Sequence, residues 1–333
     1  MKILVIGGTG VISRAIVSEG MKAGHEIIAL NRGRRNVAFA KAPQMIRADW
    51  KDGASYRSAT AGIRADAVID MLSMNPEDAE RTMAMFGGTT RQWIFTSTTC
   101  AYRKPFAAYP VRESETARWD DPAYPYAFNK AWMEEYLFSR MGGSDQPITL
   151  IRPSLTYGEG CANIGVLRQN ANIIDRIRKG KPLLLFDDGK TPITFTFAPD
   201  LARGYLACCL NPAAYNRDFH IVSRNTADME TCYRTFGALI GHEPRFACLP
   251  AETLFRLDPR QFDHIWYEKR FPHVFSIEKI RQAAPDWEPE ISLEEGLRRM
   301  MAWWEACRAA PDPEKDALED RLCGLGSKRP QSA

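Results

Sequence analysis

The first residues of the chain combine a short apolar run, a glycine-rich turn and a helical pattern. Residues 2–6 predict a buried strand, and residues 10–23 have the apolar spacing of a helix. Gly7 permits a tight turn between them, and Gly10 lets a ligand approach the helix N-terminus, where free N–H groups bind anions. The pattern therefore predicts either a simple strand-to-helix connection or a binding site for the pyrophosphate of a dinucleotide.

Ser13 stands at the third small position of this pattern, where glycine allows the closest packing of helix on strand. Serine is a small replacement, so we expect a slight outward shift of the helix. We also expect that Ser13 does not abolish binding of a cofactor.

Strands and helices alternate through the first half of the chain. A second strand ends at Asn31, and further apolar runs at 66–72, 91–98 and 148–153 predict three more. Helical patterns lie between them, for example at 76–86 and at about 125–141. This alternation predicts an α/β fold with a doubly wound parallel sheet of the Rossmann type.

The pattern changes after about residue 155. We expect residues 1–160 to form mainly a nucleotide-binding domain, to which the chain returns at about 193–222, and residues 161–310 to form mainly a small C-terminal α/β substrate lobe. Residues 311–333 are polar, and we expect the last ten or so to be disordered.

Composition excludes several classes of protein. The net charge is only +3, which gives no reason to expect a nucleic-acid or membrane partner, and no apolar run approaches the ~20 residues of a membrane span. The N-terminal apolar run is too short for a secretory signal. The eight cysteines form no C-x-x-C pair and the five histidines lie far apart. We therefore expect reduced thiols, no metal site and a cytoplasmic protein.

The end of the second strand bears on the choice of cofactor. A carboxylate there would bind the ribose diol of NAD, but the chain has Asn31 followed by Arg32, with Arg34 and Arg35 nearby. Arginine can pair with the 2′-phosphate of NADP. The sequence thus favours NADP over NAD; the alternative is a solvated basic loop.

Tyr126 and Lys130 are four residues apart on a predicted helix and share one face. A lysine ammonium near a phenol favours the phenolate, so Tyr126 is a candidate general acid or base. Thr98, at the end of the preceding strand, could hydrogen-bond the same substrate oxygen. The Y-x-x-x-K spacing also occurs by chance, and its position after that strand is what makes it informative.

These motifs together resemble the extended short-chain dehydrogenase/reductase family, in its NAD(P)-dependent epimerase/dehydratase branch. The resemblance rests on "VIGGTGVIS", "FTSTTCAY", "YAFNK" and "IRPSLTYGEG" in this order, and it covers residues 1 to about 308. It implies a catalytic set of Thr98, Tyr126 and Lys130. It implies cofactor contacts at Gly7, Gly8, Thr9, Gly10, Val11, Ile12, Asn31, Arg32, Arg35, Asp49, Trp50, Met71, Thr96, Tyr126, Lys130 and Pro153.

The chain departs from the family pattern at two places. Ile193 stands where sugar-nucleotide members usually have an arginine for the diphosphate, which puts a nucleotide-sugar substrate in doubt. Thr99 and Cys100 stand where dehydratase members often have Asp-Glu. Cys100 is a candidate on the substrate side if its thiol is activated; otherwise it is a small packed residue.

The expected function is hydride transfer at a secondary alcohol or ketone carbon of a sugar-like or other hydroxylated small molecule. Family members commonly pair through two helices, so we expect a homodimer through about 76–86 and the helix that carries Tyr126. The alternative is a non-catalytic cofactor-binding protein with an RNA or protein partner.

Overall fold

The structure is a computed structural model that describes residues 1–34, 37–114, 117–143, 146–160, 164–224 and 226–328. The chain forms two compact units. Unit 1 contains Met1–Ser154, Ala198–Val222 and Phe275–Pro289, and unit 2 contains the remaining residues. Residues 275–289, which the sequence pattern assigns to the substrate lobe, belong to unit 1.

Unit 1 is built on a seven-stranded sheet with the order β10-β6-β5-β4-β1-β2-β3, in which every pair of neighbours is parallel. This confirms the predicted doubly wound α/β fold. The strands are β1 (Lys2–Ile6), β2 (Glu26–Asn31), β3 (Gln44–Arg47), β4 (Ala65–Asp70), β5 (Thr90–Thr96), β6 (Ile148–Arg152) and β10 (Arg217–His220). The helices are α1 (Val11–Lys22), α2 (Gly53–Thr60), α3 (Pro76–Phe86), α4 (Pro125–Arg140), α6 (Ala198–Cys208), α10 (Glu278–Ala283) and the short η1 (Thr99–Ala101) and η2 (Pro212–Ala214).

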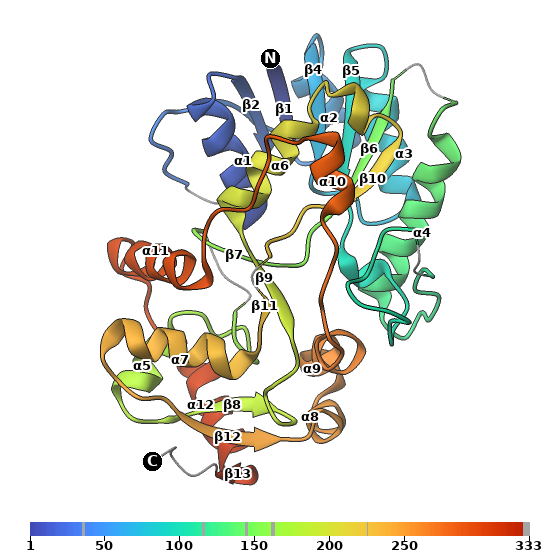
Figure 1. Cartoon of the computed structure of the whole chain (residues 1–333). Helices are drawn as coiled ribbons and strands as arrows, with labels where there is room; N and C mark the ends of the chain where they lie inside the picture. Colours follow the sequence, from blue (N-terminus) through green and yellow to red (C-terminus); the bar gives the residue numbers. More distant parts are fainter. Residues whose placement is uncertain (35–36, 115–116, 144–145, 161–163, 225, 329–333) are drawn as a thin grey trace. The chain divides into compact units, whose positions relative to one another are not determined.

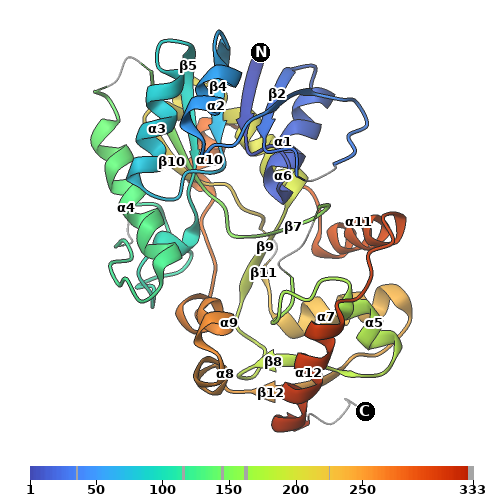
Figure 2. The ribbon, with the colours of Figure 1, turned by 180° about the vertical axis from the view of Figure 1, so that it is seen from behind.

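Helices cover both faces of this sheet because the side chains of each strand alternate between them. On β1, Ile3 and Val5 face a core shared with α1, α6 and α10, whereas Leu4 and Ile6 face a core shared with α2, α3 and α4. Figure 1 shows α6 and α10 in front of the sheet, and the reverse view shows α2 and α3 in front of it (Figure 2). Both cores bury near-continuous apolar strands, which contribute ~1.5–3 kcal/mol per large side chain.

Unit 2 contains two small sheets, with the strand orders β11-β9-β7 and β13-β12-β8. Their strands are β7 (Leu155–Tyr157), β8 (Pro182–Phe186), β9 (Ile193–Phe197), β11 (Thr226–Ala227), β12 (Arg245–Leu249) and β13 (Ser327–Lys328). The helices are α5 (Asn172–Arg178), α7 (Met229–Ile240), α8 (Ala251–Leu257), α9 (Pro259–His264), the π-helix η3 (Ile265–Lys269), α11 (Leu293–Ala306) and α12 (Pro313–Leu325). Gly241 ends α7 in the left-handed conformation, as its place after the apolar pattern predicts.

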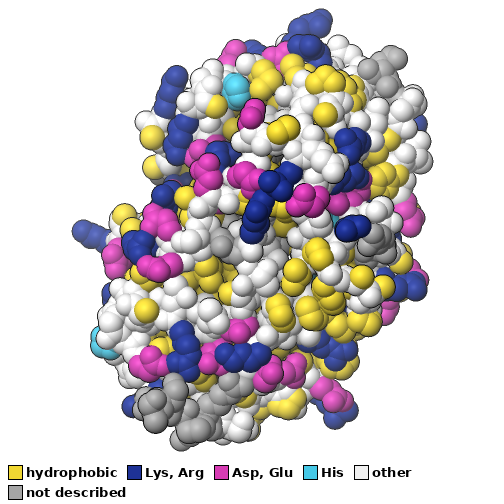
Figure 3. Space-filling view, viewed as in Figure 1, with side chains coloured by type: hydrophobic (Ala, Val, Ile, Leu, Met, Phe, Trp, Pro, Cys, Tyr) yellow, Lys and Arg dark blue, Asp and Glu magenta, His cyan; other side chains and the backbone are white. Residues whose placement is uncertain are grey.

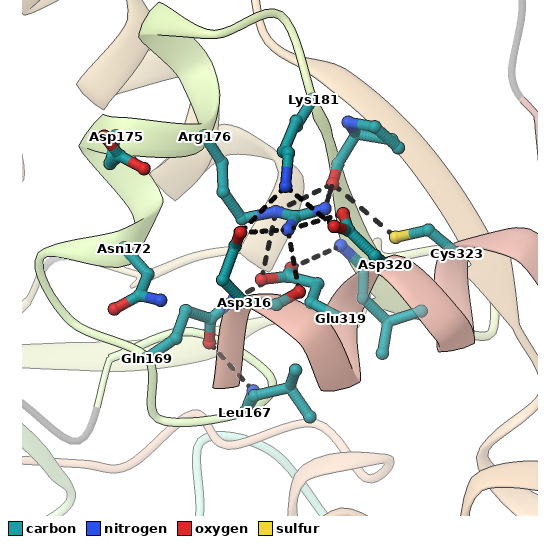
Figure 4. Close-up of polar contacts among 12 residues, drawn as sticks. Leu167, Gln169, Asn172, Asp175, Arg176, Lys181, Asp316, Glu319, Asp320 and Cys323 are labelled. Carbon is teal, nitrogen blue, oxygen red and sulfur yellow. Dashed lines mark hydrogen bonds and ion pairs between the residues drawn. The ribbon is translucent and has the colours of Figure 1, made fainter. Parts of the chain in front are cut away.

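Helix α12 occupies much of residues 311–333, which the sequence predicts to be a polar tail. It is held by charge: the guanidinium of Arg176, fully buried on α5, lies 2.5 Å from Asp316 and 2.9 Å from Asp320. Arg176 is also 3.3 Å from Glu319, and Lys181 bonds Asp316 and Asp320 at 2.7 Å each. Figure 4 shows these side chains converging between α5 and α12. Leu322 and Cys323 of this helix also join the core of unit 2, and Leu318 packs against it. Residues 329–333 lie outside the described part.

None of the helices in the described part of the chain combines the length and the apolar character that a membrane span requires.

Candidate active site

The glycine-rich turn joins β1 to α1 at the carboxyl edge of the sheet. Gly7 has a φ of +104°, which favours glycine, and a Cβ on Gly8 would lie 2.8 Å from the Cβ of Ala29 on β2. Gly10 is the N-cap of α1, so the N–H groups of Val11 and Ile12 lie in the first turn, where they have no acceptor within the helix. Together with Thr9, this turn has the geometry of an anion-binding helix N-terminus.

Ser13 is part of this turn and is 2% exposed. Its hydroxyl oxygen accepts the N–H of Gly10 at 2.9 Å and lies 3.3 Å from the carbonyl oxygen of Gly7. The side chain therefore ties the first turn of α1 to the end of β1.

Asn31 ends β2 and is 7% exposed. Its Oδ1 accepts the N–H of Gly33 at 2.7 Å, which fixes the orientation of the amide, and its buried Nδ2 has no hydrogen-bond partner among the described residues. A buried donor without a partner is costly, so this nitrogen is suited to a ligand acceptor. Arg32 follows and is exposed, whereas Arg35 lies outside the described residues.

Asp49 and Trp50 lie beside Asn31, because the N–H of Ala48 bonds the carbonyl of Asn31 at 3.0 Å. The Asp49 carboxylate is 3.9 Å from the exposed guanidinium of Arg34. The guanidinium of Arg81 lies 4.7 Å from the centre of the Trp50 ring. These contacts place both residues at the carboxyl edge of β2 and β3.

Met71 and Thr96 lie at the ends of the neighbouring strands β4 and β5. The Thr96 hydroxyl donates to the sulfur of Met71 at 3.0 Å and accepts from the hydroxyl of Tyr205 at 3.0 Å. The resemblance named Met71 and Thr96, but not Tyr205, which comes from α6.

Thr98 caps η1: its Oγ1 accepts the N–H of Cys100 at 3.1 Å. Pro153 is adjacent, since its carbonyl accepts the N–H of Thr99 at 3.0 Å. Cys100 is 6% exposed, and its carbonyl accepts from the buried ammonium of Lys104 at 3.2 Å. These contacts give Cys100 a packed position in η1.

Tyr126 and Lys130 share a face of α4. Tyr126 is 38% exposed, whereas Lys130 is 3% exposed and its Nζ donates to the carbonyls of Ser73 at 2.6 Å and Thr96 at 2.7 Å. Burial lowers the pKa of Lys130 to about 8, against the opposing charges of nearby carboxylates. An ammonium has three donors, and the described residues supply acceptors for two of them. One donor therefore remains for a ligand.

Sequence reasoning missed a buried ionic group beside this face. Glu134, one turn after Lys130, pairs with Arg152 of β6 and accepts from the hydroxyl of Ser97, which precedes Thr98. The four-residue spacing of Tyr126, Lys130 and Glu134 was a visible signal.

The residues at this edge fit an NAD(P) cofactor. The turn leads into the N-terminus of α1, and Gly8 leaves no room for a side chain. The Nδ2 of Asn31, which has no partner in the described part of the chain, offers a donor at the end of β2, where the family fold binds the adenosine ribose. All of these residues belong to unit 1.

Comparison with known proteins identifies the family. The sequence pattern of the NAD dependent epimerase/dehydratase family matches residues 3–221. The chain is 23% identical over 289 residues to a 2′-dehydrokanamycin reductase of Streptomyces kanamyceticus, covering 86% of this chain and 80% of that protein. It is 24% identical over 319 residues to the chloroplast stem-loop binding protein of 41 kDa b of Arabidopsis thaliana, covering 89% and 77%.

Among solved structures, a UDP-glucose 4-epimerase of Thermotoga maritima superposes with a TM-score of 0.74 at 18% identity, covering 92% of this chain and all of that chain. This likeness concerns the fold. The family pattern spans well over half of the sequence, so the chain belongs to the NAD-dependent epimerase/dehydratase family, in the extended short-chain dehydrogenase/reductase branch.

Proposed function

We propose that the protein transfers a hydride between NAD(P) and a secondary alcohol or ketone carbon of a sugar-like or other hydroxylated small molecule. The observation that carries the proposal is the arrangement of α4. It buries the Lys130 ammonium against two carbonyls and places Tyr126 one turn earlier with its side chain partly exposed. Family membership supports an enzyme of this kind.

In this proposal, the cofactor and the three residues of the set divide the chemistry. The bound nicotinamide supplies or accepts the hydride. Tyr126 moves the proton of the substrate oxygen, Lys130 favours the phenolate and holds the nicotinamide ribose, and the hydroxyl of Thr98 orients the oxygen. Thr98 can act in this way because its Oγ1 accepts from Cys100 and keeps its own proton to donate.

We infer that NADP(H) is preferred over NAD(H). Asn31 places no carboxylate near the ribose, so a 2′-phosphate meets no negative charge from this residue, and none of the described residues accepts a hydrogen bond from its Nδ2. The exposed guanidinium of Arg32 follows directly and can pair with the phosphate.

The substrate proposal stays at the level of chemical class. Ile193 is apolar and 1% exposed, so it offers a nucleotide diphosphate no charge. Thr99 and Cys100 are packed and supply no acid–base pair for loss of water. These residues favour oxidoreduction or epimerisation over dehydration.

We propose a homodimer in which α3 and α4 supply the interface, in a protein of the cytoplasm. Met133 and Leu137 of α4 are fully buried in the core of unit 1, whereas Trp132 is 48% exposed. A tryptophan with half of its surface in water is typical of an interface anchor.

Nucleic acid is not the partner that we propose. The net charge is +3. Among the described residues on the face drawn in Figure 3, lysine and arginine side chains are interspersed with acidic ones and do not gather into one basic surface. Such a surface is what binding of a phosphate backbone requires.

Two variants test the proposal once a substrate is found in a panel of hydroxylated and keto compounds. Tyr126→Phe removes one hydroxyl, so it should keep cofactor binding and lose ~10²–10⁴ in turnover. Lys130→Met should lose turnover and also weaken cofactor binding. Unchanged turnover of Tyr126→Phe contradicts the assignment.

A further inference from the structure

Glu134 is a fully buried carboxylate in the middle of α4. Both of its oxygens are bonded: Oε1 accepts from the Ser97 hydroxyl at 2.5 Å and from Nε of Arg152 at 2.6 Å. Oε2 accepts from Nη2 of Arg152 at 2.8 Å and pairs with Nε of Arg118 at 2.5 Å. A buried charge is tolerated only when it is paired in this way.

The network continues away from the helix. Arg152 bonds Asp218 of β10 at 2.6 Å, and Asp218 in turn pairs with Lys279 of α10. Although burial raises the pKa of Asp218, these two cations bring it below its ordinary value. The network therefore holds Asp218 as a carboxylate, and Arg152 stays charged between two anions.

The position of Glu134 connects this network to the proposed catalytic set. Tyr126, Lys130 and Glu134 follow one another at four-residue spacing, so they form one stripe along α4. Ser97, which donates to Glu134, directly follows β5 and precedes Thr98, the N-cap of η1. One carboxylate thus ties the helix that carries Tyr126 and Lys130 to the strand end that carries Thr98.

We propose that Glu134 is a positioning residue: its carboxylate fixes α4 against β5 and β6 and acts as the internal counter-charge that keeps Lys130 an ammonium. The proposal rests on the proposed function, because it assigns Lys130 the contact with the cofactor ribose.

The charges around Lys130 come from several elements. Asp70 at the end of β4, Asp78 on α3 and Glu134 on α4 all favour the ammonium, while burial opposes it and lowers its pKa to about 8. Glu134 itself contacts Arg118, Arg152 and the Ser97 hydroxyl, and its charge acts on the phenol of Tyr102. Arg152 connects it further to Asp218, which pairs with Lys279. Loss of the Glu134 charge should therefore release the Lys130 proton at a lower pH.

The test is the dissociation constant of NADPH, followed by nicotinamide fluorescence from pH 6 to pH 10. Wild-type affinity should fall as pH rises through the pKa of Lys130, because the neutral amine has lost its charge. In Glu134→Gln the midpoint of this fall should move about half a pH unit or more lower. Glu135→Gln removes the same charge from the exposed side of the same helix and should leave the midpoint unchanged. In Lys130→Met the affinity for NADPH should no longer fall over this pH range.

If Glu134→Gln does not fold, Arg118→Gln tests the same claim, with an expected shift of the midpoint to higher instead of lower pH. The Arg118 side chain is 19% exposed and pairs with the same carboxylate, so its loss strengthens the negative field at Lys130 and should raise the midpoint. A midpoint that is unchanged in Glu134→Gln, or unchanged or lowered in Arg118→Gln, overturns the inference. Wild-type protein that binds no NADPH at any pH overturns the proposed function itself, and the inference with it.

Discussion

Replacing Ser13 by glycine restores the usual third glycine of the turn, and it should destabilise the protein. Ser13 accepts the N–H of Gly10 at 2.9 Å, and such a hydrogen bond contributes ~1 kcal/mol. Glycine inside a helix costs ~0.5 kcal/mol more than serine. Ser13→Gly should therefore lower the free energy of unfolding by about 1.5 kcal/mol.

Two further variants separate these contributions. Ser13→Ala loses the hydrogen bond but gains ~0.5 kcal/mol of helix propensity, so its net loss should be about 0.5 kcal/mol. Ser18→Gly, in the middle of the same helix, carries only the propensity cost of about 0.5 kcal/mol. Urea denaturation followed by circular dichroism measures all three.

Cofactor binding should survive in both Ser13 variants, since Gly7, Gly8 and the N–H groups of Val11 and Ile12 are unchanged. The reasoning is refuted if Ser13→Gly is as stable as wild type, or if it destabilises no more than Ser18→Gly. Either result would show that the Ser13 hydroxyl does not hold the turn.

Three other predictions follow from the charged and exposed residues. Arg32→Ala should weaken NADP(H) binding and leave NAD(H) nearly unchanged in a fluorescence titration; equal losses would show that Arg32 does not contact the 2′-phosphate. Burial raises the pKa of Glu319 from 4.5 to about 7, so the folded protein retains a proton that the unfolded chain releases. Wild-type stability should therefore fall as pH rises from about 4.5 to about 7, and Glu319→Gln should reduce that fall in urea denaturation; an identical pH dependence would contradict it. Light scattering should give a dimer mass for wild type and a monomer mass for Trp132→Glu, and a monomeric wild type would reject the interface.

Much of unit 1 was predictable because its strands are apolar runs between helical patterns. The exceptions have physical causes. Strand β3 lies at the edge of the sheet and is largely exposed, so it lacks an apolar run, and α2 is rich in glycine, serine and threonine, which favour helices weakly. Helix α12 escaped prediction because much of what holds it is polar: Asp316 and Asp320 pair with Arg176 of α5.

The candidate site was predictable as a set of residues but not as a set of contacts. The spacing of Tyr126 and Lys130 and the turn at Gly7 are local patterns. The carbonyls that hold Lys130 belong to Ser73 and Thr96, which are 57 and 34 residues away in sequence. Only the folded sheet brings them to one place, and the same is true of the pair between Glu134 and Arg152.

The most direct test of the account is a titration of the purified wild-type protein with NADPH and with NADH, followed by nicotinamide fluorescence. The turn between β1 and α1, the Asn31 Nδ2, which has no hydrogen-bond partner among the described residues, and the exposed Arg32 predict saturable binding of both, with NADPH bound more tightly. Absence of binding of either nucleotide at millimolar concentration would contradict the account.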